Sequence, residues 1–286
     1  MKEKGIIEMS ENSFGGKWTV EKLNILSNYL SAYLDALKNK PFKKIYVDAF
    51  AGTGKITIGD VEEEIVGSVR LALNRERRFD RYIFIEKKKR FARELQTIVD
   101  TEYLEIKDRI IIKNEDCNAA LLEICKKTNW STNRAILFLD PYATEVKWDT
   151  LMAVAATKAF DVWYLFPFSA AQRMMKNDGE IDESWRLKLN SLFGDKGWYD
   201  RFYTIDPQIN LFGEESKIKN INANELSIYI TERLETIFPA VARKPRLFYN
   251  TKNSPLFLFC FAVANDNPKA CNLALRIANH ILKDKE

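Results

Sequence analysis

Short apolar runs that alternate with helical patterns constrain the fold of this chain more than any other feature. Five such runs lie at residues 44–50, 81–86, 109–116, 136–141 and 161–168. They are apolar along most of their length, which is typical of strands buried on both faces of a parallel sheet. Helical patterns fill the stretches between them, at 68–76, 87–99, 117–127 and 148–158. We therefore expect an α/β fold with a largely parallel sheet.

Two later segments modify this simple repeat. The runs 246–251 and 256–264 are joined by the short turn KNSP, which predicts an antiparallel C-terminal hairpin. Together with the five parallel strands, this hairpin predicts a seven-stranded, mostly parallel sheet. Residues 169–222 do not fit the repeat, because they are polar, helical only in patches and rich in aromatic residues. We interpret them as an inserted helical subdomain.

The domain organisation follows from these elements. Residues 1–41 contain leucines at helical spacing, ending at a proline, and predict an N-terminal helical segment that packs on the core. Residues 42–168 and 223–286 then form one Rossmann-like domain, interrupted by the insertion 169–222.

The composition argues against several kinds of chemistry. His280 is the one histidine of the 286 residues, which argues against a His-rich metal site and a Ser-His-Asp triad. The four cysteines show no CxxC spacing, so neither a zinc site nor a disulfide framework is predicted. No apolar stretch reaches 18 residues, so no membrane span is expected, and we expect a cytoplasmic protein. A net charge of +4 is compatible with a polyanionic partner without indicating one.

The segment VDAFAGTGK, residues 47–55, follows the first run and contains two closely spaced glycines. A P-loop requires G-x-x-x-x-G-K-[ST], but Ala49 replaces its first glycine and Ile56 replaces its hydroxyl residue. A dinucleotide fingerprint requires G-x-G-x-x-G, and Thr57 occupies the third glycine position. Both phosphate-binding motifs therefore fit poorly.

The same segment resembles the first loop of class I S-adenosylmethionine (SAM) methyltransferases, in which an acid precedes an x-x-x-G-x-G turn. Asp48, Gly52 and Gly54 match this pattern. SAM carries no phosphate, so its loop needs a close backbone approach, which glycine permits, and a carboxylate near the ammonium and sulfonium charges. A turn that uses glycine only for its geometry fits the motif alone equally well. The resemblance implies that Phe50 and Ala51 also line the cofactor.

Two further acids follow the next two strands. Glu86 ends the second run, where a carboxylate can accept both ribose hydroxyls of an adenosine ligand. Asp116 ends the third run, where it could accept from an adenine amino group, and Cys117 follows it in the predicted cofactor site. Each acid alone fits a solvated strand end, but three acids at successive strand ends favour a SAM site, with Asp48 as the first.

The fourth run ends in Asp140-Pro141-Tyr142, which resembles the [DNS]-P-P-[YFW] motif of methyltransferases that act on exocyclic amines of bases. Such an amine is a poor nucleophile, because its lone pair is delocalised into the ring. The Asp140 carboxylate and the Pro141 carbonyl would accept its two N–H groups, and Tyr142 would stack on the base. A D-P turn that only closes a strand is the alternative. One proline is missing, and Ala143 departs from the glycine of the related D-P-[FY]-G motif.

Several segments together, in one order, resemble the three-Cys-motif partner proteins (TcmP). They are KWTVEKLNILSNYLSAYLDAL, YVDAFAGTGK, GSVRLAL, FIEK, FLDPYA and SPLFLFCFA. The resemblance implies a Rossmann-like class I methyltransferase fold with SAM as cofactor, no metal, and the insertion on the substrate side. It also implies a possible partner, a three-cysteine protein resembling radical-SAM enzymes. That family usually reads D-P-Y-G, so Ala143 is a departure here as well.

The leading hypothesis is a SAM-dependent methyltransferase acting on a base amine in RNA or DNA. Basic clusters at 75–81 and 86–90, with Lys244 and Arg246, could follow a phosphate backbone, although solvated helix faces explain each cluster as well. One alternative is a catalytically weak SAM-fold protein that binds the three-cysteine enzyme. Another is a small-molecule N-methyltransferase in which the insertion is a lid.

Overall fold

The computed structural model describes four stretches of the chain, residues 16–53, 55–58, 61–205 and 216–283. Its centre is an eight-stranded sheet in the order β10-β12-β7-β6-β1-β4-β5, with β11 also paired to β12. The strands are β1 (Lys43–Asp48), β4 (Arg81–Ile85), β5 (Ile110–Lys113), β6 (Asn133–Leu139), β7 (Phe160–Phe166), β10 (Ala240–Val241), β11 (Arg246–Tyr249) and β12 (Pro255–Val263).

The strand directions confirm the predicted fold class, a Rossmann-like class I methyltransferase fold. Strands β5, β4, β1, β6 and β7 are parallel, and β12 runs antiparallel beside β7. The predicted hairpin is β11 with β12. The sheet has eight strands rather than the expected seven because β10, a pair of residues ahead of β11, also pairs with β12.

Strand alternation gives the sheet two separate apolar faces. On β1, the side chains of Ile45 and Val47 join one core, and Tyr46 between them joins the other. All three are almost fully buried, as expected for a central strand covered on both sides. This burial explains why the five parallel runs are apolar rather than alternating.

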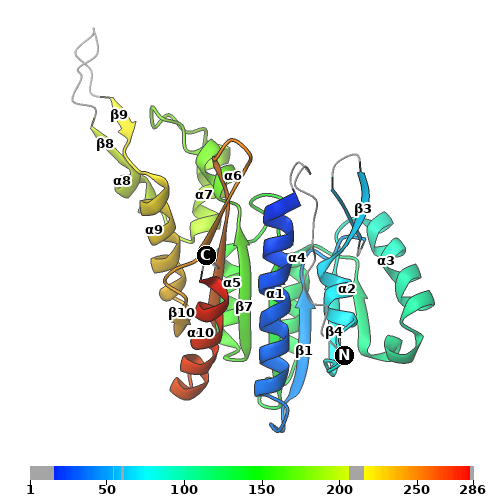
Figure 1. The fold of residues 1–286 in the computed structure, drawn as a ribbon. Helices are drawn as coiled ribbons and strands as arrows, with labels where there is room; N and C mark the ends of the chain where they lie inside the picture. The colour runs from blue at the N-terminus through cyan, green and yellow to red at the C-terminus, as the bar shows by residue number, and fades with distance from the viewer. Residues whose placement is uncertain (1–15, 54, 59–60, 206–215, 284–286) are drawn as a thin grey trace.

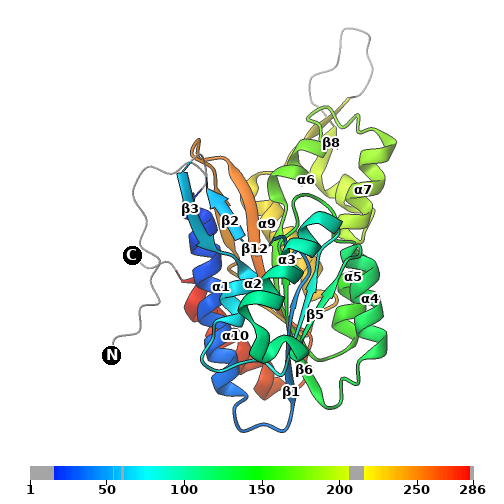
Figure 2. The same cartoon turned by 90° about the vertical axis from the view of Figure 1, so that its right-hand side faces the viewer.

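Helices cover both faces and make a three-layer molecule (Figures 1 and 2). One face carries α1 (Gly16–Ala36), α2 (Ser68–Leu73), α3 (Lys89–Glu102), the 3-10 helix η1 (Leu104–Arg109) and α10 (Pro268–Leu282). The other carries α4 (Cys117–Lys127), α5 (Trp148–Ala156), α6 (Phe168–Met174), α7 (Glu183–Phe193), α8 (Trp198–Phe202) and α9 (Ala223–Glu235). Within the described residues, no helix combines the length and apolarity needed to cross a membrane.

The segment 169–222 contains most of α6 together with α7 and α8, and a short hairpin of β8 (Tyr203–Ile205) and β9 (Lys217–Lys219) projects from it (Figure 1). Its largest fully buried side chains within the described residues, Phe193, Trp198 and Phe202, lie in the same core as the sheet face beneath them. The segment therefore shares its hydrophobic core with the main domain. Its role on the substrate side stays a prediction. A second small hairpin, β2 (Lys55–Ile58) with β3 (Val61–Val66), lies between β1 and α2.

Candidate functional site

The carboxyl ends of three neighbouring strands bring predicted site residues to one edge of the sheet. Asp48 is the last residue of β1, which lies between β4 and β6. It is in register with Phe84 on β4 and with Phe138 on β6. Glu86 and Asp140 each follow two residues later. The strand order reverses at β1, and ligands of such sheets bind at this switch point.

The loop after β1 is fastened to the end of β4. Gly52 has φ +59°, a left-handed conformation that glycine adopts without strain. Its amide donates to Oε2 of Glu86 at 3.0 Å, and the amide of Ala51 donates to the carbonyl of Ile85 at 3.0 Å. Oε1 of Glu86 accepts from the amide of Lys88 at 2.6 Å. The carboxylate is 5% exposed, and each oxygen retains a lone pair for a further donor.

Asp48 lies beneath this loop and is fully buried. Its Oδ1 accepts from the amide of Phe50 at 3.1 Å, and its Oδ2 accepts from the hydroxyl of Ser68 at 2.6 Å. Burial raises the pKa of Asp48 to about 7, although these two hydrogen bonds favour the charged form. Asp48 therefore ties the loop to the start of α2, and its predicted role beside a cofactor charge stays a prediction.

The pKa of Asp48 predicts a measurable dependence of stability on pH. An aspartate with its ordinary pKa near 3.8 ionises early in the unfolded chain, whereas folded Asp48 keeps its proton until about pH 7. Stability is therefore lost as the pH rises through this window. Asparagine does not titrate, so Asp48→Asn does not lose this stability. When the pH is raised from 5 to 8, we expect the free energy of unfolding of Asp48→Asn to increase relative to that of wild type by about 2–3 kcal/mol. Urea denaturation of both ligand-free proteins at each pH would measure it, and a constant difference would contradict it.

The third predicted acid, Asp116, begins α4 as its N-cap. Its Oδ1 accepts from the backbone and side-chain amides of Asn118 at 3.0 and 3.1 Å. Its Oδ2 lies 3.4 Å from Nζ of Lys87, and 41% of the side chain is exposed. Cys117 is buried, and burial raises the pKa of its thiol to about 12, so it is an inert thiol. Asp116 thus lies just after β5, and the amides of Asn118 in the first turn of α4 fix the position of its Oδ1.

The structure gives Asp140 a partner from the N-terminal helix. The ammonium of Lys22 on α1 contacts Oδ2 of Asp140, and the lysine is only 3% exposed. Lys22 also lies 5.2 Å from the ring centroid of Trp18 and 5.9 Å from that of Phe138. A buried lysine is costly unless it is paired, so this ion pair fixes α1 against the end of β6.

The rest of the Asp-Pro-Tyr motif combines a buried proline with an exposed tyrosine at the same edge. Pro141 is buried, whereas Tyr142 is 69% exposed, which is unusual for a large aromatic side chain. Nζ of Lys88 lies 5.3 Å from the centroid of the Tyr142 ring. The amide of Ala143 donates to Oε2 of Glu145 at 2.7 Å, which orders the turn. The motif therefore presents an open aromatic face beside a carboxylate.

Sequence reasoning understated two residues of this site. Lys22, Leu26, Tyr29 and Tyr33 share one helical face at i, i+4, i+7 and i+11. A charge on such an apolar stripe is the signal that could have identified it. Ser68 carried no comparable signal, because its contact with Asp48 spans 20 residues.

Two predicted cofactor residues, Phe50 and Gly54, follow β1 in the sequence. Phe50 is half-buried and packs against the core on the α4 side of the sheet. Gly54 lies outside the described residues, so its role stays a prediction.

Most basic side chains named as possible phosphate contacts have protein partners. Arg75 donates to the hydroxyls of Ser27 and Ser31 on α1, and Arg246 forms an ion pair with Glu21 at 2.7 Å. In the first cluster, therefore, Arg75 holds helices together. Lys87 and Lys88 lie next to Asp116 and Tyr142, as described above.

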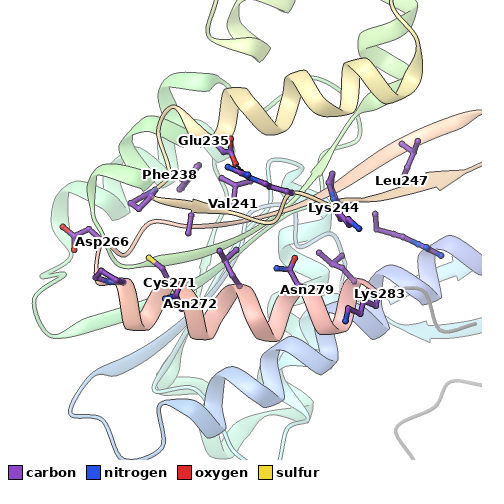
Figure 3. Close-up of a pocket in the computed structure, with 18 of the residues that line it drawn as sticks. Glu235, Phe238, Val241, Lys244, Leu247, Asp266, Cys271, Asn272, Asn279 and Lys283 are labelled. Atoms are coloured by element: carbon purple, nitrogen blue, oxygen red, sulfur yellow. Dashed lines mark hydrogen bonds and ion pairs between the residues drawn. The ribbon is translucent and has the colours of Figure 1, made fainter.

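A cavity of about 1390 Å³ lies away from the candidate site, at the outer edge of the sheet (Figure 3). It opens between α10 and the connection from α9 through β10 to β11. Figure 3 shows Asn279 on α10, Lys283 directly after the end of this helix, and Lys244 on the strand side.

Comparisons with solved structures find likenesses of fold at low identity. A Legionella pneumophila protein assigned to the family DUF519 is 12% identical and has a TM-score of 0.47, covering 91% of this chain and 92% of its own. The methyltransferase domain of a bacterial Hen1 protein is 12% identical with a TM-score of 0.40, covering 84% of this chain and 98% of its own. Spermidine synthase from Thermotoga maritima is 13% identical with a TM-score of 0.40, covering 92% and 64%.

No protein-family model matches the chain, including any for the TcmP proteins that it resembles in sequence. No curated protein matches it either. The function is therefore argued from the site itself.

Proposed function

We propose that this protein is a SAM-dependent methyltransferase that methylates an exocyclic amine of a nucleic-acid base. One observation carries the proposal. Glu86, with a lone pair left on each oxygen, and the Asp140-Pro141-Tyr142 motif with its exposed tyrosine lie at the same switch point of the sheet. A cofactor site and an amine-binding motif would then be neighbours, as methyl transfer requires.

The cofactor half of the proposal rests on Glu86 and the loop that it holds. Two backbone amides fix the carboxylate, and its remaining lone pairs suit the two hydroxyls of a ribose. Gly52 lets the backbone approach the methionine part closely, because it carries no side chain. Asp116, oriented by Asn118, would accept from the adenine amino group. SAM would supply the electrophilic methyl group, and these residues would hold it at the edge of β1.

The acceptor half rests on Asp140 and its neighbours. The contact with Lys22 engages Oδ2 of Asp140, which leaves Oδ1 for an N–H of the substrate. The carbonyl of Pro141 would accept the second N–H, so the amine lone pair would turn toward the methyl group. The exposed ring of Tyr142 would stack on the base. A base can reach this ring only after it leaves its own stack, so single-stranded or flipped nucleotides are the expected substrates.

The ion pair of Lys22 with Asp140 also favours a second function. It occupies part of the acceptor that an amine would need, as expected for a catalytically weak protein. Together with the sequence resemblance to TcmP proteins, this observation supports a binding partner of a three-cysteine, radical-SAM-like enzyme. A small-molecule N-methyltransferase is the third possibility.

Transfer of a labelled methyl group separates these functions. The purified protein is incubated with tritiated SAM and, in separate reactions, with total cellular RNA, total DNA and a small-molecule extract. We expect label in RNA or DNA. Label in the extract alone would favour a small-molecule enzyme. If no pool is labelled, even with the three-cysteine protein added, the proposed activity is wrong and the binding role takes its place.

Tyr142 gives a prediction specific to a base substrate. Tyr142→Ala should weaken binding of the labelled nucleic acid by about 1–3 kcal/mol, the usual contribution of one stacked base. Tyr142→Phe keeps the ring and should bind like wild type. Fluorescence anisotropy with a labelled oligonucleotide of the methylated pool would measure both, and equal affinities for all three proteins would rule out stacking on Tyr142.

A further inference from the structure

A second cavity, of about 630 Å³, lies between α1, α10 and the starts of β6 and β7. The polar side chains of its inner wall are Tyr29, Tyr33, Arg134 and Asp161. Asp161 is in register with Ile136, four residues before Asp140. At ~3.3 Å per residue the two aspartates are ~13 Å apart along the sheet. The cavity is therefore distinct from the proposed methyl-transfer site.

Asp161 is a half-buried carboxylate, and a hydroxyl is its hydrogen-bond partner. The hydroxyl of Tyr29 donates to its Oδ2 at 2.6 Å. No ion pair to Asp161 occurs among the residues that the structure describes. The guanidinium of Arg134 acts on Asp161 through its charge, but it donates to the carbonyl of Trp130 at 2.7 Å and stacks 3.9 Å from the ring centroid of Phe42. A cationic ligand in direct contact with the carboxylate would therefore stabilise its charged form further.

Tyr33 is a second polar group on the same wall. Its side chain is buried, and its hydroxyl has no hydrogen-bond partner within the described part of the chain. Burial, and then the charge of Asp161, raise the pKa of Tyr33 well above its ordinary value of 10. Tyr33 therefore stays neutral and adds no charge to the cavity wall.

The surroundings favour a cation with an apolar body. The apolar lining residues include Leu37, Val263, Leu273, Ala274 and Ile277. Helix α1 ends at the cavity, and a helix C-terminus attracts positive charge. Helix α10 begins there, but the side chain of Asn267 already accepts from the amides of Lys269 and Ala270. Lys40 and Lys269 are exposed at the rim, where water screens them.

We propose that this cavity binds a small organic amine. The ammonium group donates to the carboxylate of Asp161. The apolar body packs against Leu273 and Ile277. The volume suits a small ligand, since ligand cavities typically enclose about 300–1,000 Å³.

The charge state of Asp161 gives the site a pH dependence. Burial raises the pKa of Asp161 to about 6, and the Tyr29 hydroxyl and the Arg134 charge partly oppose this. The other titratable groups that line the cavity are Tyr33, Lys40, Asp266 and Lys269. Asp266 forms an ion pair with Lys158 at 2.7 Å. Amine affinity should therefore fall as the pH drops below 6, because protonated Asp161 loses its charge.

Phenethylamine tests the proposal, because it combines one ammonium with one apolar ring. Calorimetry with the full chain should show saturable binding to one site, at least tenfold tighter than that of the neutral 2-phenylethanol. Affinity should decrease between pH 7 and pH 5. Equal binding of the alcohol, or affinity independent of pH, would overturn the proposal.

Variants locate the binding. Asp161→Asn should weaken the binding of phenethylamine at least tenfold. Tyr33→Phe removes a hydroxyl that protein atoms cover, so it should bind phenethylamine like wild type. Ala270→Phe, which narrows the cavity from α10, should abolish binding. Asp140→Asn, at the other site, should also bind phenethylamine like wild type. If Asp140→Asn loses binding, or Asp161→Asn and Ala270→Phe keep it in full, the amine binds elsewhere and the proposal fails.

Discussion

Asp140→Ala is expected to abolish methyl transfer while leaving SAM affinity nearly unchanged. In the proposed reaction the carboxylate accepts an amine N–H only while the base is held in line with the methyl group. Removing such a preorganised contact typically slows catalysis by a factor on the order of a hundred or more. The measurement is tritiated methyl incorporation into the nucleic-acid pool that wild type labels, beside calorimetry of SAM binding. Equal labelling by the variant would remove Asp140 from the mechanism.

The contact with Lys22 decides how this experiment must be controlled. Asp140→Ala leaves Lys22 buried without a counter-charge, and breaking a buried pair in this way costs about 3–5 kcal/mol of stability. Asp140→Asn keeps the shape and one acceptor, so it should fold and retain partial activity. Asp149→Ala, an exposed aspartate on α5, is the matched control and should behave as wild type. Urea denaturation of each variant separates lost activity from lost structure.

Glu86→Ala is expected to reduce SAM affinity by about two to four orders of magnitude. Two ribose hydroxyls would lose a charged acceptor, and each such hydrogen bond is worth about 1.5–3 kcal/mol. The amides of Gly52 and Lys88 would lose their acceptor as well, so the loop after β1 would loosen. Calorimetric titration with SAM and with its demethylated product measures the change.

Two comparisons make the Glu86 result specific. Glu86→Gln keeps one carbonyl oxygen for an amide but loses the charge, so its affinity should fall between those of wild type and Glu86→Ala. Glu94→Ala removes a partly exposed glutamate that pairs with Arg90 on α3, and it should bind SAM normally. A wild-type protein without measurable SAM affinity, or Glu86→Ala with unchanged affinity, would contradict the cofactor assignment.

Most of the fold could be predicted because its signals are local. Continuous apolar runs such as 44–50 and 81–86 match β1 and β4 within one or two residues, since a strand buried on both faces has no polar positions. The packing of 169–222 could not be predicted in the same way. Its aromatic residues are buried by contact with a distant part of the sheet, and no periodicity of the sequence records that contact.

The places of the candidate site residues at the strand ends could be predicted, but their contacts could not. Acids at strand ends can be recognised in the sequence, because each one lies at or near the end of a continuous apolar run. The pairing of side chains is not visible in the sequence, because Lys22 and Asp140 are 118 residues apart. Burial is not visible either, and it makes Asp48 an anchor of the loop with a pKa near 7 rather than an exposed carboxylate.

The position of β12 in the sheet has a consequence for how this chain is made. β12 is the last strand in sequence, yet it lies inside the sheet, paired with β7 on one side and with β10 and β11 on the other. Until residues 255–263 leave the ribosome, β7, which carries Trp163, is an open edge, and β10 and β11 lack the strand with which they pair. Unpaired apolar edges of this kind promote association with other chains. The newly made chain should therefore be most prone to aggregation while β7, β10 and β11 are already outside the ribosome and β12 is not.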